Sequence, residues 1–296
     1  MATVTPVTEH LLRALGLPEA EGDSKDGRGR VLVVAGCTQL PGAVLLAAEA
    51  AMRAGAGKLQ IAVCRDLAVP IGIAVPEALV VGLPQTPDGG IASACADDLA
   101  GRAGRSDAVL AGPGMNEDAD GAALAAALVR GAADGDAGVV LDAGALAALS
   151  DAPGLTGGLA RPAVITPHAG EMAKLLGQSR EAIEADPLAA ARAATDRFGT
   201  VTVMKGGRTH VVAPDGQAWC YEVGHVGLAT SGSGDTLAGL IVGLLARGAA
   251  PEAAALWSVY AHGEAGRRLA RRYGGIGFLA REIPGQVPGI LAEVMA

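Results

Sequence analysis

Short apolar runs alternate with Ala- and Leu-rich segments of helical length along most of the chain. The runs are rich in Val, Ile and Leu and contain few polar positions, which is typical of strands buried on both faces. Strands of this kind, separated by helices, form a parallel sheet that helices cover on both sides. The predicted strands are 30–36, 58–63, 78–83, 108–112, 138–142, 163–166 and 201–204. The predicted helices between them are 43–54, 92–103, 119–133, 170–177 and 187–198.

One stretch breaks this alternation. The apolar runs 209–213 and 218–223 flank Pro214-Asp215-Gly216, which is the turn chemistry of an antiparallel hairpin. Two long helices then follow, at 235–247 and 252–272. The pattern therefore predicts an α/β fold in which a mainly parallel sheet, covered by helices on both faces, carries an antiparallel hairpin.

The pattern also bears on domain organisation. No linker, repeat or low-complexity tract interrupts it, and 296 residues suit one α/β domain. We therefore predict a single domain over residues 1–296. The first 28 residues and the Gly- and Pro-rich segment 285–296 are expected to be its loose, peripheral ends.

Composition narrows the class of function. Half of the residues are hydrophobic, only 2% are aromatic, and the formal net charge is -8. Nucleic-acid surfaces need basic patches and stacking platforms, so we predict no nucleic-acid partner. The N-terminus lacks the features of a signal peptide, and the longest apolar run, 237–246, is about half the length of a membrane helix. We therefore expect a cytoplasmic protein without a membrane partner.

The cysteines and histidines predict no metal framework. The four cysteines lie far apart, without a Cys-x-x-Cys pair, at positions 37, 64, 95 and 220. Disulfides and metal sites are therefore not expected, and reduced thiols are the default. The spacing of His168 and Glu171 is not a metal-binding pattern either, so no metal ligand is assigned to the protein.

The sharpest chemical signal is Gly232-Ser233-Gly234-Asp235-Thr236, at the start of a predicted helix. A helix N-terminus presents unpaired amides and the positive end of the helix dipole, and glycines there let a phosphate approach closely. Asp235 lies at the mouth of this cradle. It either caps the helix, as aspartate commonly does, or acts on a group beside the phosphate. The stretch is neither a Walker A loop nor a full dinucleotide-binding fingerprint.

Other polar and glycine clusters follow predicted strands, where open α/β sheets bind ligands. Gly112-Pro113-Gly114 is either a plain turn or a close approach to a ligand. Lys205-Gly206-Gly207-Arg208-Thr209 either contacts phosphate or only begins the hairpin. His168 is a loop histidine that satisfies its own hydrogen bonds or a site residue, and Asp142 is a polar strand end or a site carboxylate.

Taken in order, these clusters resemble the NAD(P)H-hydrate dehydratase family, a branch of the ribokinase-like superfamily. The resemblance extends roughly from Arg30 to Pro284, nearly the whole chain, and it implies a ribokinase-like three-layer α/β/α sandwich. The segments that carry it are Pro41-Gly42-Ala43, Arg53-Ala54-Gly55-Ala56-Gly57, Gly112-Pro113-Gly114, Asp142-Ala143-Gly144-Ala145-Leu146, Thr166-Pro167-His168-Ala169-Gly170-Glu171-Met172, Lys205-Gly206-Gly207-Arg208-Thr209, the stretch 224–248 and Tyr260-Ala261-His262-Gly263.

This resemblance implies repair of the hydrated, damaged form of NADH or NADPH, with ADP as co-substrate and ATP as the other candidate. Asp235 would take the proton from the hydroxyl of the hydrate, whose oxygen attacks the terminal phosphorus of the nucleotide. The phosphate then leaves, and the dihydronicotinamide is restored. Mg²⁺ is expected to bridge the nucleotide phosphates.

The resemblance also implies binding roles and partners. The hydrate would be contacted by Ala43, Gly114, His168 and Asp235. The nucleotide would be held by two loops, through Lys205, Gly206, Gly207, Arg208, Thr209, His225, Ser231, Gly232, Ser233 and Gly234. A homo-oligomer is expected, with a homotetramer as the form that related proteins suggest. The family's epimerase is expected to be a separate protein, because this chain has no room for it.

Several positions depart from the family pattern. Ser233 replaces the usual Thr and keeps the hydroxyl, and Ala147 replaces the usual Asn. Three further departures are singled out. His225 stands where the family usually has Asn, and Ser231 stands where it usually has Gly. Gly144 replaces the second aspartate of the usual Asp-x-Asp-Ala-Leu. Each change is expected to bear on nucleotide choice, magnesium handling or substrate.

Two other functions would use the same residues. A small-molecule kinase of the hydroxyethylthiazole-kinase type would share the cradle and Asp235 but would release a stable phosphorylated product. A non-catalytic nucleotide-binding sensor would account for the three departures, whereas the retention of Asp235 beside Gly232 and Gly234 argues for catalysis. Product analysis separates the two enzymes, and substitution of Asp235 separates both from the sensor.

Overall fold

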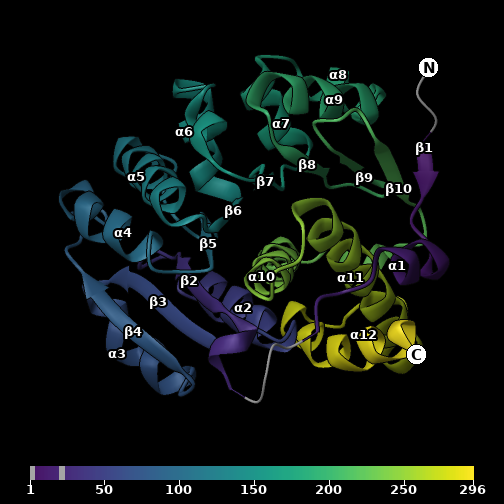
Figure 1. Cartoon of the computed structure of the whole chain (residues 1–296), viewed down its shortest axis with the longest axis horizontal. Helices are drawn as coiled ribbons and strands as arrows, with labels where there is room; N and C mark the ends of the chain where they lie inside the picture. The colour runs from purple at the N-terminus through teal and green to yellow at the C-terminus, as the bar shows by residue number, and fades with distance from the viewer. Residues whose placement is uncertain (1–3, 20–23) are drawn as a thin grey trace.

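A computed structural model describes residues 4–19 and 24–296. Within these residues, ten strands form one sheet in the order β1-β10-β9-β8-β7-β6-β5-β2-β3-β4, which runs through the middle of the molecule (Figure 1). Neighbouring strands are parallel except that β9 runs antiparallel to both β8 and β10. The strands are β1 (Val4–Pro6), β2 (Arg30–Val34), β3 (Lys58–Cys64), β4 (Ala78–Leu83), β5 (Ala108–Ala111), β6 (Gly138–Leu141), β7 (Val164–Ile165), β8 (Val201–Met204), β9 (Thr209–Val212) and β10 (Ala218–Tyr221).

Helices cover both faces of this sheet, which gives three layers. Alternate residues of β2 point to opposite sides, so that Val31 and Val33 join one core while Leu32 and Val34 join the other. The first core is covered by α1 (Glu9–Leu15), α2 (Gly42–Arg53), α3 (Arg65–Ala74), α10 (Ser233–Ala246), α11 (Pro251–Tyr273) and α12 (Val287–Met295). The second is covered by α4 (Ala96–Ala103), α5 (Ala119–Gly135), α6 (Ala147–Asp151), α7 (Ala169–Leu176), α8 (Arg180–Ala185) and α9 (Pro187–Phe198). Among the described helices, none combines the length and apolar character that crossing a membrane requires.

The predicted alternation of strands and helices is confirmed, as is the antiparallel hairpin. Every predicted strand and helix is present, with ends that differ by at most two residues except at the helix predicted over 92–103, where α4 begins at Ala96 after a 3₁₀ turn at Ser93–Cys95. The sequence pattern did not predict three further helices: α3, in which Pro70 interrupts an otherwise apolar stretch, and the short helices α6 and α8. The three-layer α/β/α fold with a mainly parallel sheet is therefore the fold of this chain.

The described parts of the two chain ends are packed, not loose. Strand β1 extends the sheet beside β10, Leu12 of α1 is fully buried, and Trp257 Nε1 donates a hydrogen bond to Gly16 O at 3.0 Å. At the other end, α12 buries Val287, Ile290, Leu291 and Val294. Residues 1–3 and 20–23 of the predicted loose N-terminal segment lie outside the described residues. The expectation of loose ends is wrong for the rest, because the spacing of the buried α12 residues is that of a helix face, and Pro288 and Gly289 concealed it.

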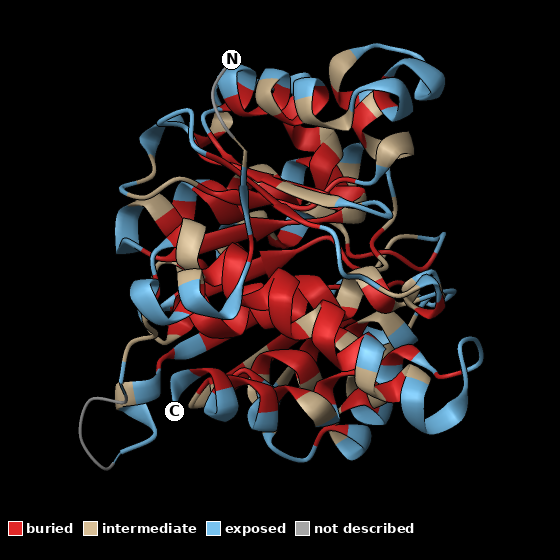
Figure 2. Ribbon diagram, turned by 90° about the vertical axis from the view of Figure 1, so that its right-hand side faces the viewer, coloured by how far each residue is buried: buried red, intermediate tan, exposed pale blue. Residues whose placement is uncertain are grey.

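Helix α10 lies at the centre of the first layer and is buried along most of its length (Figure 2). It crosses α2 at very close range. A Cβ atom on Gly239 would lie 2.3 Å from Ala47 O, and one on Gly243 would lie 2.5 Å from Ala51 O. The two backbones therefore touch, and this contact fixes the position of the α10 N-terminus beside the first turn of α2.

Candidate active site

The carboxyl ends of the parallel strands gather a cluster of charged side chains. Asp142 follows β6, Thr166 follows β7 and Lys205 follows β8, so three neighbouring strands bring them to the same edge. Asp142 accepts a hydrogen bond from Thr166 Oγ1 at 2.7 Å and one from Lys205 Nζ at 2.9 Å. Asp142 is almost completely buried. Of the two interpretations of this residue, the structure therefore favours the site carboxylate.

Lys205 is the hub of this cluster. Its ammonium also lies 3.7 Å from Glu171 Oε2, at the first turn of α7. Burial lowers the pKa of Lys205, but the negative charges of Asp142, Glu171 and Asp235 outweigh it and raise that pKa above its usual value. The lysine is therefore a permanent positive charge held among three carboxylates.

The N-terminus of α10 faces the same cluster. The helix begins at Ser233, two residues earlier than predicted, and Gly232 is its N-cap. Asp235 is thus the third residue of the first turn, so the capping interpretation of Asp235 is wrong. Among the described residues, the amides of Gly234 and Asp235 have no hydrogen-bond acceptor, as is usual at a helix start. A Cβ atom on Gly234 would lie 3.2 Å from Lys205 Nζ, which places a fixed cation beside two free amides.

Gly232 is required by the geometry of the cradle. Its φ is +85°, a left-handed conformation that favours glycine. A Cβ atom there would also lie 2.2 Å from Leu46 Cδ1 of α2. The turn that aims the free amides therefore depends on the left-handed backbone that glycine allows, and the end of the Leu46 side chain fills the space beside it.

Asp235 is partly buried, and its environment changes its acidity. Burial raises its pKa, the neighbouring charge of Asp142 raises it further, and that of Glu171 adds to the shift, whereas Lys205 opposes them. The resulting pKa is about 6. At neutral pH the side chain is therefore mostly an ionised carboxylate with a proton affinity well above that of an ordinary aspartate, which suits a general base.

The two loops predicted to hold a nucleotide lie side by side. A Cβ atom on Gly224 would be 4.0 Å from Gly207 O, so the β8–β9 turn faces the loop before α10. Arg208 is exposed, with Nε 3.6 Å from Glu222 Oε1. His225 Nδ1 accepts a hydrogen bond from Gly227 N at 3.2 Å and thereby caps the short 3₁₀ helix 226–228.

The remaining residues assigned to the nucleotide occupy these loops. Gly206 and Gly207 are exposed in the β8–β9 turn, and Thr209 is the first residue of β9. Ser231 is exposed beside the cradle, and Ser233 is the first residue of α10. The residues predicted for the nucleotide thus lie in two neighbouring loops, the β8–β9 turn and the loop that leads into α10, and among them Ser233 is buried.

The residues predicted to contact the hydrate fall into two groups. Gly114 has a φ of +66°, and a Cβ atom there would lie 2.8 Å from Ala43 Cβ, so the turn after β5 touches the first turn of α2. His168 is the N-cap of α7, and its Nδ1 accepts hydrogen bonds from Gly170 N at 3.0 Å and Glu171 N at 3.2 Å. The histidine does satisfy its own hydrogen bonds, yet the same cap holds Glu171 beside the charged cluster.

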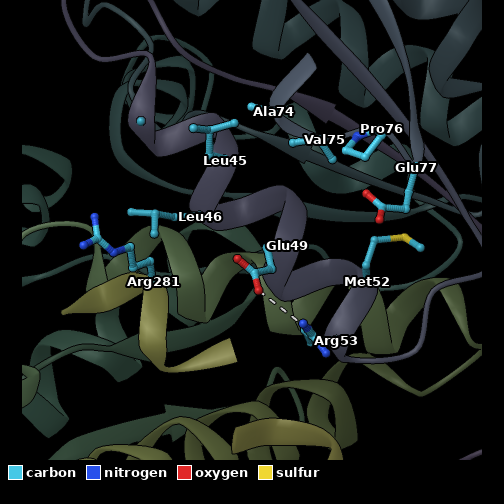
Figure 3. A pocket seen from close by; sticks show the side chains of 11 residues that line it. Leu45, Leu46, Glu49, Met52, Arg53, Ala74, Val75, Pro76, Glu77 and Arg281 are labelled. Atoms are coloured by element: carbon cyan, nitrogen blue, oxygen red, sulfur yellow. Dashed lines mark ion pairs between the residues drawn. The ribbon is translucent and has the colours of Figure 1, made fainter. Parts of the chain in front are cut away.

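Two surface depressions flank these groups. A cleft of about 540 Å³ between α6 and α7 is lined by His168, Glu171, Gly144 and Lys174, and so opens from the charged cluster. A second groove of about 810 Å³ runs along the outer side of α2 (Figure 3). Its lining includes Leu45, Leu46, Glu49, Arg53 and Arg281 but none of the residues predicted for the site. The first cleft is therefore the one connected to the candidate chemistry.

Gly144 has a structural explanation. Ala143 before it is held at a φ of +47°, and a Cβ atom on Gly144 would lie 2.6 Å from Met115 O. The aspartate usual in the family would not fit this backbone unless the 115–116 turn moved. Glycine at position 144 thus allows the loop after β6 to approach the 115–116 turn closely beside the cleft.

Sequence reasoning left some site residues without a role. Glu171 was part of a recognised motif, and its position three residues after His168 is a capping-box signal, which the structure confirms through a 2.7 Å hydrogen bond from His168 N to Glu171 Oε2. Thr166 carried no signal beyond its place at a strand end. The contact of Lys205 with Asp142 was not foreseen, because the two residues are 63 positions apart.

The sheet topology and the cradle at the α10 N-terminus define a ribokinase-like α/β protein. The sequence profile described as NAD(P)H-hydrate dehydratase matches residues 31–288. Because this match spans most of the chain, the protein belongs to the NAD(P)H-hydrate dehydratase family.

Individual relatives agree with this assignment. The chain is 50% identical over 290 residues to the ADP-dependent (S)-NAD(P)H-hydrate dehydratase of Xanthomonas campestris pv. campestris, covering 97% of this chain and 96% of that protein. It is 37% identical to the bifunctional NAD(P)H-hydrate repair enzyme Nnr of Moorella thermoacetica, of which it spans 52%. Its structure superposes on the ADP/ATP-dependent NAD(P)H-hydrate dehydratase of Bacillus subtilis, co-crystallised with ATP and Mg²⁺, with a TM-score of 0.80, 28% identity and 99% coverage of each chain.

Proposed function

We propose that this protein dehydrates (S)-NAD(P)H hydrate to NAD(P)H at the expense of ADP, and so repairs a damaged nicotinamide coenzyme. The observation that carries the proposal is the position of Asp235: a carboxylate with a raised pKa next to free helix amides and the ammonium of Lys205. A base beside an anion cradle is the arrangement that phosphoryl transfer to a hydroxyl requires. The high identity to a relative of that name supports the choice of substrate.

The first step forms a phosphate ester. Asp235 removes the proton from the hydroxyl of the hydrate, and the hydroxyl oxygen attacks the terminal phosphorus of ADP, so the bond between that phosphorus and the bridging oxygen breaks and AMP leaves. The amides of Gly234 and Asp235, together with Lys205, stabilise the negative charge on the transferring group. Positioning and electrostatics supply most of the catalysis in such reactions.

The second step removes the phosphate. The lone pair of the ring nitrogen expels the phosphate with cleavage of the carbon–oxygen bond, and the adjacent ring carbon then loses a proton to restore the dihydronicotinamide double bond. Phosphate is a far better leaving group than hydroxide, which is why the nucleotide is consumed. The Lys205 cation beside the cradle also favours the departing phosphate, because it remains positive throughout.

Magnesium fits this site when it enters with the nucleotide. Among the described residues, no group of three or more His, Cys, Asp or Glu side chains could hold a metal ion. Mg²⁺ in phosphoryl transfer needs only one or two carboxylates besides phosphates and water, and Asp142 and Glu171 offer these around the cradle. Such an ion would neutralise charge on the nucleotide phosphates.

The experiment that tests the function compares nucleotides and identifies products. The pure protein is incubated with NADH hydrate, Mg²⁺ and either ADP or ATP, while the dihydronicotinamide absorbance is followed. Recovery of that absorbance with release of phosphate supports the dehydratase and identifies the preferred donor. A stable phosphorylated product would instead indicate a small-molecule kinase, and no turnover despite nucleotide binding would indicate a sensor.

The acidity of Asp235 predicts a pH dependence. Because its pKa is raised to about 6, the base becomes protonated as the pH falls through that value, and kcat/KM should decline below about pH 6 and level off above it. Replacing Asp142 by Asn removes a negative neighbour that raises this pKa, so the midpoint should move to lower pH. Initial rates measured from pH 4.5 to about pH 8 locate both midpoints.

The opposite shift is the control for this prediction. Replacing Lys205 by Gln removes the cation that lowers the pKa of Asp235, so the midpoint should move to higher pH whatever happens to the maximal rate. If the pH midpoint of kcat/KM is the same in the wild type and in both variants, the assignment of Asp235 as the titrating base is contradicted.

His168 provides a test of the hydrate side of the site. We propose that it contacts the hydrate, so His168→Ala should raise KM for the hydrate more than KM for the nucleotide. The substitution also removes a helix cap, at a cost of about 1 kcal/mol. His168→Asn serves as the matched control, because Asn caps helices well but lacks the imidazole. Equal increases of both KM values in the two variants would count against the contact.

The assembly and setting of the protein are further parts of the proposal. We infer a homo-oligomer, for which a tetramer is the expected form, acting in the cytoplasm. Support comes from exposed apolar side chains at the β4 edge of the sheet, Val69 and Ile73 on α3 and Leu79 on β4. The chain spans about half of the length of the bifunctional repair enzymes that it matches.

A further inference from the structure

A histidine of α11, His262, contacts Ser233, the first residue of α10. His262 Nε2 lies 2.9 Å from Ser233 Oγ and 3.0 Å from Ser233 O. Ser233 is buried, opens α10 and directly precedes the two free amides of Gly234 and Asp235. Ser233 and His262 are 29 positions apart in the sequence, so both contacts are tertiary contacts between two helices. A side chain of α11 therefore holds the residue on which the geometry of the cradle depends.

The chemistry of the two contacts fixes which ring nitrogen carries hydrogen. The backbone carbonyl of Ser233 can only accept a hydrogen bond, so the 3.0 Å contact requires a hydrogen on His262 Nε2. Burial lowers the pKa of His262, the hydrogen bond to the Ser233 backbone opposes this shift, and the nearby Lys205 charge adds to it, so that the resulting pKa is about 4. The ring is therefore neutral at physiological pH and has a single N–H. Nδ1 is then unprotonated.

With this tautomer, the Ser233 hydroxyl can donate its own hydrogen to another group. When Nε2–H points toward the carbonyl and hydroxyl oxygens, Ser233 Oγ receives part of that hydrogen bond and keeps its own hydrogen to donate elsewhere. With the other tautomer, the hydroxyl hydrogen would instead point to His262 Nε2. The choice of tautomer therefore decides whether the cradle has a hydroxyl donor next to its amides.

We propose that His262 is a positioning residue, which holds Ser233 through Nε2–H so that the Ser233 hydroxyl donates a hydrogen bond to the terminal phosphate of the bound nucleotide. This inference rests on the proposed function for the identity of the nucleotide. It adds a third donor to the amides of Gly234 and Asp235 and a residue, His262, that acts through Ser233 without touching the substrates.

The experiment is a double-mutant cycle read out by ADP affinity in calorimetry, in the presence of Mg²⁺. His262→Leu should weaken ADP binding by about 10-fold, the loss expected for one hydrogen bond to a charged group, and Ser233→Ala should weaken it similarly. In the Ser233→Ala background, His262→Leu should cost little more, because its effect passes through the serine. His262→Gln, whose amide can donate to the same carbonyl, should recover part of the affinity.

Control measurements separate this proposal from a packing effect and from the proposed function. Ser258 lies on α11, as His262 does, and its buried hydroxyl has no hydrogen-bond partner. Ser258→Ala should therefore leave the affinity for ADP unchanged. The affinity for ADP is measured without the hydrate, so the double-mutant cycle tests the role of His262 independently of the reaction. A wild-type protein that binds ADP but restores no NADH would refute the proposed function and leave this test intact. Equal losses on His262→Leu in both backgrounds, or no recovery with Gln, would overturn the proposal.

A second measurement uses the wild-type protein and needs no substitution. ¹⁵N NMR of the histidine ring nitrogens distinguishes a ring protonated at Nε2 from one protonated at Nδ1. The proposal predicts the Nε2–H form for His262 with ADP bound. An Nδ1–H form would overturn it even if His262→Leu failed to fold.

Discussion

Replacement of Asp235 by Asn is expected to lower kcat by about 10²-fold or more, the range for a lost general base. Asn keeps the size of the side chain but cannot take the proton from the hydrate's hydroxyl. The amides of Gly234 and Asp235 belong to the backbone, so the cradle remains and ADP affinity should change little. Steady-state kinetics with saturating ADP give kcat, and calorimetry gives the Kd for ADP.

Asp186→Asn is the matched control for this variant. Asp186 also lies at a helix start, where its Oδ1 accepts a hydrogen bond from Ala189 N at 3.0 Å, and Asn caps helices equally well. The control should have wild-type kcat. An Asp235→Asn enzyme with unchanged kcat would show that Asp235 is not the base, and loss of ADP binding without a change in kcat would assign it to binding.

Substitution of Gly232 by Ala is the second change from which we expect a large effect. The added Cβ would lie 2.2 Å from Leu46 Cδ1, at a φ of +85° that alanine adopts only at a cost of about 1–2 kcal/mol. The methyl group displaces the flexible end of the Leu46 side chain, and together with the strained φ this contact shifts the turn that aims the free amides of α10. Because donors act on the transition state only when well aimed, kcat should fall by about 10²-fold. The same steady-state assay measures it.

Two further variants separate the clash from backbone strain. Gly248 has a φ of +92°, but a Cβ atom there meets nothing within 4 Å, so Gly248→Ala has the strain without the clash and should keep wild-type kcat. Leu46→Ala in the Gly232→Ala background makes room for the new methyl group and should restore part of the activity. A Gly232→Ala enzyme as active as the wild type would contradict the cradle geometry.

The fold could be predicted from the sequence because its signals are local. Buried strands show as runs of Val, Ile and Leu, and the hairpin shows in Pro214-Asp215-Gly216. The glycines around Ser233 identified the cradle for the same reason. The predicted start of the helix was two residues late, because Gly232 caps it through a left-handed backbone and no capping side chain marks the position.

The charged cluster could not be predicted in the same way. The meeting of Lys205 with Asp142 and Glu171 depends on β6, β7 and β8 being neighbours in the sheet, and the sequence does not state strand order. His262 was part of a recognised motif, but its contact with Ser233 depends on how α11 packs against α10. Local pattern thus located the individual groups, whereas tertiary packing determined which of them act together.

The structure also explains two departures from the family pattern. His225 caps a short helix through its own Nδ1, so it has a local structural role next to the nucleotide loop. Gly144 lets the 115–116 turn approach closely beside the cleft. Ser231 is exposed, and nothing in the structure explains the change at that position.

The central claim is that the hydroxyl oxygen of the hydrate attacks phosphorus and then leaves with the phosphate. It is tested most directly with NADH hydrate carrying ¹⁸O in its hydroxyl group, incubated with the protein, ADP and Mg²⁺ in unlabelled water. Mass spectrometry of the products should find one ¹⁸O atom in the released phosphate for each NADH formed. Unlabelled phosphate with the ¹⁸O in water, or a stable labelled phosphate ester without NADH, would contradict the account.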